Sequence, residues 1–238
     1  MVAATDVTLT NARGVYSSSL AEWTLFACAY FAKDFPRMRA AQADARWAPY
    51  DVEELRGRTL GVVGFGDIGQ AAARLAKAYG MRVVALRRST APPAPDAPCD
   101  AVFPPEQLHA LMGASDYVVM ATPLTPATTK LVDAAAFGAM KRTGVFINVG
   151  RGPCVDEAAL TAALQAGSIR GAALDVFEVE PLPASSALWA LPNALLSPHC
   201  ADRTADFQAA AMRAFVANAA RYVERKPLDC VVDKAAGY

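Results

Sequence analysis

The sequence has few of the side chains that bind metal ions or form disulfide bonds. Its 238 residues include two histidines, His109 and His199, which is too few for the usual zinc sites. Five cysteines are spread along the chain and none belongs to a Cys-x-x-Cys pair: Cys28, Cys99, Cys154, Cys200 and Cys230. Because their number is odd and their spacing is wide, we expect reduced, mostly packed thiols in a reducing compartment and no metal site.

The sequence also has no excess of either charge and no long apolar run. Its 23 basic and 23 acidic residues cancel, so nothing electrostatic favours nucleic acid or an anionic membrane as a partner. The most apolar stretch, 20–32, contains Glu22 and is shorter than the roughly 18 residues that cross a membrane. No basic segment followed by an apolar one stands at the N-terminus, so we expect no signal peptide and a cytoplasmic location. An organellar location stays open if a further segment precedes Met1.

What the sequence does contain is a regular alternation of apolar runs and helical segments. Hydrophobic residues make up 54% of the chain, enough for a packed domain. The apolar runs are rich in β-branched residues, which is typical of buried parallel strands, and they lie at 59–65, 82–86, 116–122, 144–149, 171–176 and 193–198. Helical segments separate most of them. The sequence therefore predicts an α/β fold with a doubly wound parallel sheet of the Rossmann type.

The segments on either side of this alternation predict further helices. Residues 17–56 begin with serines, which are good helix N-caps, and continue as a helix over 17–38 and then a polar connection. Between about Leu20 and Phe35 the apolar residues are too dense for a helix with one buried face. This helix should therefore be buried almost all round, against its own domain or a second subunit. Residues 204–226 predict a final amphipathic helix with basic residues in its last turn.

A glycine-rich loop joins the first predicted strand to the next helix. It reads "GFGDIG", with Gly64, Gly66 and Gly69 around Asp67 and Ile68. In this context the first glycine permits a tight turn, the second lets a pyrophosphate approach the backbone, and the third lets the helix pack closely on the strand. The N-terminus of the helix supplies free N–H groups for the anion. We interpret these residues as a dinucleotide site; the alternative is a glycine turn without a ligand.

Two arginines stand where an NAD site usually has an acid. That acid, expected about 20 residues after the glycines, binds the ribose hydroxyls. Here Arg87 lies 18 residues after Gly69, Arg88 and Ser89 follow it, and the next acid is Asp96. Guanidinium groups attract a 2′-phosphate, which a carboxylate would repel. The sequence therefore predicts that NADP(H) is preferred and NAD(H) possible; the alternative is ordinary solvated charge at a strand end.

Six segments, in this order along the chain, resemble the D-isomer-specific 2-hydroxyacid dehydrogenases: "LAEWTLFACAYFAKDFPR", "LRGRTLGVVGFGDIGQ", "ATPLTPATT", "INVGRGPCVDEAAL", "AALDVFEVEPLP" and "LLSPHCADRT". The resemblance covers almost the whole chain. It implies an active site formed by Arg151 in "NVGRG", Glu180 in "EVEP" and His199 in "SPH". Singly, each is as well explained as an ordinary surface residue; together and in this order, they favour the catalytic interpretation.

These residue types suit the reduction of a 2-oxo acid, which needs a hydride at the carbonyl carbon and a proton at its oxygen. A nicotinamide supplies the hydride. His199 suits the proton transfer because imidazole titrates near neutrality. Glu180, placed against the other ring nitrogen, would favour the protonated ring and fix its orientation. Arg151 would hold the substrate carboxylate and polarise the carbonyl in a fork geometry that lysine cannot copy.

The resemblance also implies contacts with the cofactor outside the glycine loop. Asp175 in "LDVF" would touch the nicotinamide carboxamide, and the loop from Thr122 would pass over the cofactor. The complete set implied in this region is Thr122, Pro123, Val149, Arg151, Asp175 and His199.

By the same resemblance the chain divides into four parts. Residues 1–16 would be a remnant of a substrate domain, and 17–56 a linking helix and connection. Residues 57–203 would be the dinucleotide-binding domain, and 204–238 a helix and tail that return to the substrate domain. Most of the substrate domain, with one wall of its cleft, would then be absent.

Two functions therefore stay open. The first is an oxidoreductase that interconverts a small 2-oxo acid, of the glyoxylate or hydroxypyruvate class, and a D-2-hydroxy acid. The second is a catalytically silent module for dinucleotide binding or dimerisation. In either case we expect a homodimer that buries the helix from about Leu20 to Phe35, both from its apolar density and from the resemblance.

Overall fold

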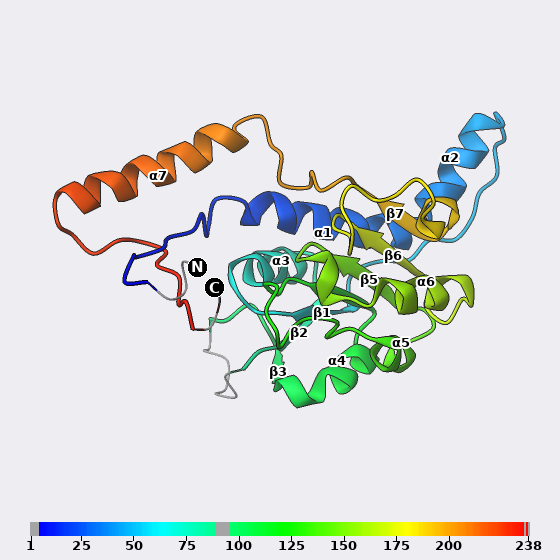
Figure 1. Cartoon of the computed structure of the whole chain (residues 1–238). Coiled ribbons are helices and arrows are strands. Elements are labelled where there is room, and N and C mark those ends of the chain that lie inside the picture. Colours follow the sequence, from blue (N-terminus) through cyan, green and yellow to red (C-terminus); the bar gives the residue numbers. More distant parts are fainter. Residues whose placement is uncertain (1–4, 89–95, 236, 238) are drawn as a thin grey trace.

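A parallel β-sheet forms the centre of the structure, a computed structural model that describes residues 5–88, 96–235 and 237. These residues form seven strands in the order β3-β2-β1-β4-β5-β6-β7, and each neighbouring pair is parallel (Figure 1). The strands are β1 (Thr59–Val63), β2 (Arg82–Leu86), β3 (Ala101–Phe103), β4 (Tyr117–Met120), β5 (Val145–Asn148), β6 (Gly171–Leu174) and β7 (Ala194–Leu196). The predicted doubly wound sheet is confirmed.

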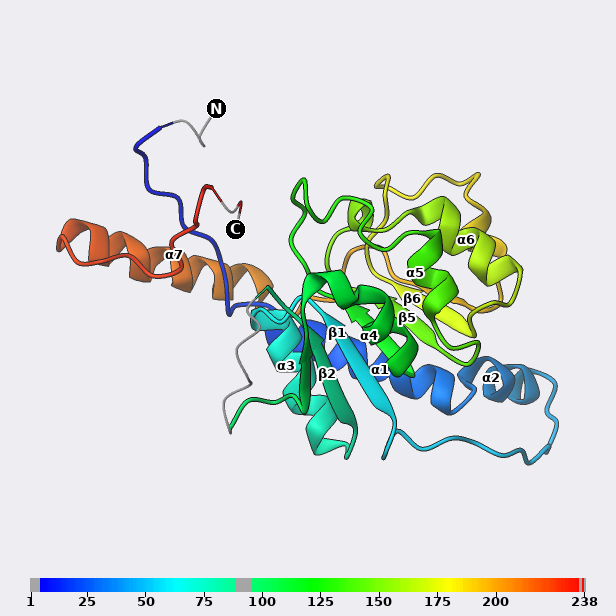
Figure 2. The same ribbon diagram turned by 90° about the horizontal axis from the view of Figure 1, so that it is seen from below.

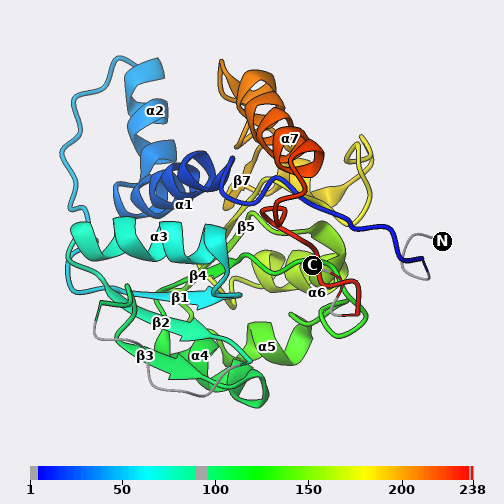
Figure 3. The same cartoon turned by 90° about the vertical axis from the view of Figure 1, so that its left-hand side faces the viewer.

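Helices cover both faces of this sheet, which is why its central strands are buried at every position. Helices α1 and α3 lie on one face, and α4, α5 and α6 on the other (Figures 1 and 3). Strand β4 shows the division: Tyr117 and Val119 join the core under α1 and α3, whereas Val118 and Met120 join the opposite core. The helices between β1 and β7 are α3 (Asp67–Ala78), α4 (Leu108–Ala114), α5 (Ala134–Ala139) and α6 (Glu157–Gln165). Short 3₁₀ turns lie between the same strands: η2 (Pro105–Gln107), η3 (Gly152–Cys154) and η4 (Ala187–Ala190).

Two parts of the secondary structure differ from the sequence-based expectation. The edge strand β3 was not predicted, because three half-buried residues give too short a pattern. The single helix expected over 17–38 is two helices, α1 (Ser17–Ala32) and α2 (Phe35–Ala43). They are separated at Asp34, whose backbone is left-handed with φ 49°. The predicted connection after Met38 is wrong as far as residue 43, where good helix formers prolong α2.

Helix α1 packs on the sheet with one side and presents apolar side chains on the other. Phe31 reaches β6 because Gly171 has no side chain there; a Cβ at that position would overlap the phenyl ring. Arg170 fastens the same end of the helix, donating to the Phe31 carbonyl at 2.5 Å and to Glu53 at 2.8 Å. Phe26 points outward and is 49% exposed. We expected almost all sides of α1 to be buried, and within the described part of this chain only the side that faces the sheet and α3 is.

The C-terminal helix α7 (Phe207–Val223) projects away from the sheet (Figures 1 and 2). Within the described part of the chain it has no buried residue. Its start stacks on the N-terminal segment, with the rings of Tyr16 and Phe207 4.8 Å apart. The segment before α1 forms one antiparallel bridge, from Thr10 to Val231. Among the described residues, no helix is both long and apolar enough to cross a membrane.

Candidate active site

The loops that follow β1, β4, β5 and β6 pack directly on one another, because all these strands end at the same edge of the sheet. Glycines allow the close approach. A Cβ on Gly64 would lie 2.7 Å from Thr122, and one on Gly150 would lie 3.0 Å from the carbonyl oxygen of Thr122. A Cβ on Gly152 would overlap the carbonyl of Phe177. The predicted site residues on these loops are therefore held in one continuous row.

The glycine loop has the geometry that its sequence predicts. Gly64 has a φ of 96°, which favours glycine. A Cβ on Gly69 would overlap the Gly64 carbonyl and lie 2.9 Å from Val62, so α3 packs closely on β1. Gly66 is exposed, and no described atom lies within 4 Å of where its Cβ would be. The loop thus leaves open space at the N-terminus of α3, as a pyrophosphate site requires.

The side chains of Asp67 and Ile68, which lie between Gly66 and Gly69, contact other parts of the protein. The carboxylate of Asp67 accepts a hydrogen bond from the Ser17 hydroxyl at the start of α1. Ile68 packs against the core between the sheet, α1 and α3. Both residues therefore fix the helix that carries the loop, and a contact between either side chain and the cofactor stays a prediction.

The two arginines lie where β2 ends, next to the glycine loop. Gly64 donates its N–H to the carbonyl of Leu86, the last residue of β2, at 3.2 Å. Arg87 comes next and donates its own N–H to the carbonyl of Phe103 in β3 at 3.1 Å. Arg88 is exposed. Ser89, the third predicted phosphate-binding residue, lies outside the described residues.

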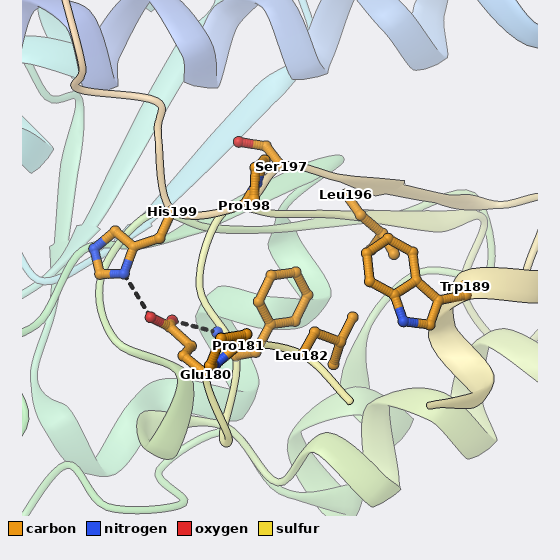
Figure 4. Close-up of a pocket in the computed structure, with 9 residues that line it drawn as sticks. Glu180, Pro181, Leu182, Trp189, Leu196, Ser197, Pro198 and His199 are labelled. Atoms are coloured by element: carbon orange, nitrogen blue, oxygen red, sulfur yellow. Dashed lines mark hydrogen bonds and ion pairs between the residues drawn. The ribbon is translucent and has the colours of Figure 1, made fainter. Parts of the chain in front are cut away.

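His199 and Glu180 form a hydrogen-bonded pair at the same edge (Figure 4). The distance from His199 Nδ1 to a Glu180 carboxylate oxygen is 2.7 Å, and the other carboxylate oxygen accepts the Phe177 N–H at 2.9 Å. Burial by itself raises the pKa of Glu180. The hydrogen bonds from His199 and Phe177 and the charges of His199 and Arg151 outweigh it, so this pKa lies below its ordinary value. Glu180 is therefore ionised at neutral pH.

Arg151 follows β5 and is exposed, with its guanidinium 2.6 Å from the Gly150 carbonyl. Its turn is shaped by Asn148, the last residue of β5. The Asn148 side chain accepts the Gly150 N–H at 3.0 Å and donates to the Arg151 carbonyl at 3.3 Å. Sequence reasoning missed Asn148; its signal was an amide at the end of the apolar run "VFIN".

Four further predicted cofactor residues lie in the loops that follow β4, β5 and β6. Val149 is 3% exposed and its side chain belongs to the core, so a contact between this side chain and the cofactor stays a prediction. Thr122 and Pro123 lie in the loop after β4, where the Pro123 carbonyl accepts the Thr128 hydroxyl at 2.7 Å. Asp175 is buried, and its carboxylate accepts hydrogen bonds from the loop that carries His199. Its predicted contact with the carboxamide stays a prediction.

An apolar pocket of about 570 Å³ adjoins the pair. Figure 4 shows Glu180 between the imidazole of His199 on one side and the apolar side chains on the other. The pocket is lined mainly by Phe177, Pro181, Leu182, Trp189, Leu196 and Pro198. Within the described residues, no group of three side chains is placed to hold a metal ion.

Comparison with known proteins identifies the family to which the chain belongs. Residues 25–201 match the family model of the D-isomer specific 2-hydroxyacid dehydrogenase, NAD binding domain. The chain belongs to this family. The resemblance of the six sequence motifs is thereby confirmed.

Similar curated proteins include a glyoxylate/hydroxypyruvate reductase B from Citrobacter koseri, 44% identical over 163 residues, which cover 66% of this chain and 47% of that protein. A glyoxylate reductase from Thermococcus gammatolerans is 42% identical over 151 residues, 63% of this chain and 44% of that protein. The chain thus spans about half the length of the curated relatives it matches.

Similar solved structures include a D-isomer specific 2-hydroxyacid dehydrogenase from Xanthobacter autotrophicus in complex with NADPH and MES. It has a TM-score of 0.88 and 38% identity, covering 98% of this chain and 95% of that one. The NADPH-dependent glyoxylate/hydroxypyruvate reductase of Sinorhizobium meliloti, in complex with NADP and sulfate, has a TM-score of 0.88 and 32% identity, covering 99% and 74%.

The geometry of the loop predicts that alanine at Gly66 affects cofactor binding, whereas alanine at Gly69 affects the stability of the fold. Gly66→Ala should leave the melting temperature unchanged but weaken NADPH binding at least about tenfold, because the new methyl group enters the space that the pyrophosphate needs. Gly69→Ala should lower stability by about 1–3 kcal/mol through overpacking. Thermal unfolding and calorimetric titration measure both. Gly138→Ala in α5, where no described atom lies within 4 Å, is the control; equal NADPH affinity in Gly66→Ala would contradict the assignment.

Proposed function

We propose that this chain binds NADP(H) across the row of loops and interconverts a small 2-oxo acid and a D-2-hydroxy acid, with glyoxylate or hydroxypyruvate as the substrate class. The observation that carries the proposal is the His199–Glu180 pair, 2.7 Å apart, on the loop row that also holds the open glycine loop and Arg151. The names of the relatives, which are reductases of these acids, support the substrate class.

The side chains divide the work of the proposed reduction. When bound, the nicotinamide supplies the hydride that goes to the carbonyl carbon. His199 Nδ1 is engaged by Glu180, so Nε2 is the ring nitrogen that gives a proton to the carbonyl oxygen. The ionised Glu180 stabilises the positive charge of the protonated ring and fixes its plane. Arg151 binds the substrate carboxylate through its planar guanidinium.

The proposed preference for NADP(H) rests on the position of the arginines. Arg87 and Arg88 follow β2 beside the glycine loop, where the adenosine ribose of a dinucleotide lies in this fold. No acid stands at the strand end to bind the ribose hydroxyls. The similar structures from Xanthobacter autotrophicus and Sinorhizobium meliloti, which contain NADPH and NADP, support the same choice.

One observation favours the alternative, a dinucleotide-binding module without turnover. The side chain of His199 is 45% exposed, and Arg151 is exposed as well. Proton transfer and substrate positioning both weaken when water reaches the reacting groups. Binding of NADPH without detectable reduction of glyoxylate, hydroxypyruvate or pyruvate would establish the module.

We also propose that the chain forms a homodimer through the outer side of α1 and α2. Phe26, Tyr30 and Phe35 form a row there, with ring centroids 6.1 and 5.5 Å apart. The neighbouring Met38 is exposed. An exposed apolar patch of this kind is typical of a subunit interface.

For the assembly, we expect a dimer at micromolar concentration in sedimentation velocity and a monomer after Phe26→Asp, because the charge would be buried without a partner. Phe215→Asp on the exposed side of α7 is the matched control and should leave the dimer intact. A monomeric unmodified chain would refute this interface.

For the cofactor, we expect NADPH to bind about 10- to 100-fold more tightly than NADH, since a hydrogen bond to a charged group contributes about 1.5–3 kcal/mol. Arg87→Asp should reverse the order, because the carboxylate repels the 2′-phosphate and accepts ribose hydroxyls. Calorimetric titration with both nucleotides measures this. The control Arg142→Asp lies at the opposite edge of the sheet, before β5, and should change neither affinity. Equal affinities in the unmodified chain would make the arginines ordinary surface charge.

For the reaction, we expect His199→Gln to slow any 2-oxo acid reduction by roughly 10²- to 10⁴-fold, the usual contribution of a general acid. NADPH affinity should stay within about twofold, since the imidazole acts on the substrate. His109→Gln, the same change at the exposed histidine of α4, is the control. A His199→Gln variant with full activity would remove His199 from the mechanism.

A further inference from the structure

The backbone of His199 lies in a conformation that only a few per cent of residues with a Cβ adopt. Its φ is 50°, in the left-handed region that residues with a Cβ rarely adopt. A residue stays in that region only where the surrounding structure holds it. The hydrogen bonds that hold this residue therefore decide where its imidazole points.

Those hydrogen bonds converge on Asp175, the residue after β6. Its backbone carbonyl accepts the His199 N–H at 2.9 Å. One carboxylate oxygen accepts the N–H groups of Cys200 at 3.0 Å and Ala201 at 3.1 Å, and also the hydroxyl of Ser197. The second oxygen lies 3.3 Å from the Ala201 N–H. A single acid thus binds the loop on both sides of His199.

The position of Asp175 is itself fixed. Its N–H donates to the carbonyl of Asn148 in β5 at 3.1 Å, and the residue is 1% exposed. A carboxylate buried to this degree is costly unless donors satisfy it. Here the donors all come from the loop 197–201, so the solvation of the acid and the shape of the loop depend on each other.

We propose that Asp175 is a positioning residue for the His199–Glu180 pair. Its carboxylate holds the loop 197–201 in the one shape that keeps His199 left-handed and brings Nδ1 within 2.7 Å of Glu180. This inference rests on the proposed function for its catalytic meaning, but the geometry that it asserts does not need turnover. It differs from a contact with the nicotinamide carboxamide, because the carboxylate hydrogen bonds described above are directed to the loop.

The imidazole of His199 can be observed by itself, because the chain has only one other histidine, His109. Nitrogen-15 spectra of the imidazoles, assigned with His199→Gln, report the hydrogen bond to Glu180 and its loss in Glu180→Gln. Asp175→Ala should change the His199 signals as Glu180→Gln does and leave those of His109 unchanged. Asp175→Asn should preserve much of the signal, because the amide oxygen can accept from Cys200 and Ala201.

The NADPH affinity separates positioning from cofactor contact. We expect it to stay within about twofold in Asp175→Ala. Unchanged His199 signals in Asp175→Ala would overturn the proposal. If the NADPH affinity then also falls tenfold or more, Asp175 acts on the cofactor and not on the loop. If Asp175→Ala does not fold, Ser197→Ala removes one of the three donors to the same oxygen and should still shift the His199 signals; unchanged signals there would overturn it as well.

Kinetics test the catalytic meaning separately. In Asp175→Ala, kcat should fall about 10- to 100-fold with KM within about threefold, and a second change, Glu180→Gln, should add little because both act through His199. Additive losses would contradict a shared route. An unmodified chain without turnover would refute the proposed reaction and leave the spectroscopic test of the loop unaffected.

Discussion

The site depends on the close contact between loops that follow neighbouring parallel strands. Parallel strands place their carboxyl ends at one edge, but side chains would normally keep the loops apart. Glycines remove that obstacle at three points, where Gly64, Gly150 and Gly152 touch the backbone or side chain of the next loop. These contacts join the glycine loop, through the loops after β4 and β5, to the loop of Glu180. His199, on the loop after β7, is added by its hydrogen bond to Glu180. Adding a Cβ at any of the three points would separate groups that must act on one ligand.

A buried polar layer beneath these loops sets their shape. Asn148 and Asp175 end adjacent strands, and a backbone hydrogen bond of 3.1 Å joins them. The first shapes the turn of Arg151, and the second holds the loop of His199. Neither side chain is exposed, and each satisfies its polar atoms on the loop above it. The reacting side chains are therefore oriented from below, by strand ends that the sheet itself keeps rigid.

Local features of this site could be predicted from the sequence, and features that join distant segments could not. The roles of the three loop glycines follow from a strand, a turn and a helix in sequence order, and the position of Arg87 follows from its spacing. By contrast, the pairing of Glu180 with His199 spans 19 residues, and only the resemblance to a family implied it. The resemblance implied a contact between Asp175 and the cofactor, but it did not reveal the hydrogen bonds of this carboxylate to the loop 197–201. No local pattern reveals these hydrogen bonds, because the donors, two backbone N–H groups and the Ser197 hydroxyl, lie more than 20 residues away.

The charged groups at the edge of the sheet that carries the site favour the binding of anions, although the chain as a whole is neutral. Three acids in this region are engaged by donors: Asp67 by the Ser17 hydroxyl, Glu180 by Phe177 and His199, and Asp175 by the loop 197–201. The acids thus serve the fold and the histidine, and their charge is offset locally. The guanidiniums of Arg88 and Arg151 extend from exposed residues at the same edge, and the N-terminus of α3 adds its partial positive charge. A dinucleotide phosphate and a substrate carboxylate would therefore meet a positive field that the net charge of the chain conceals.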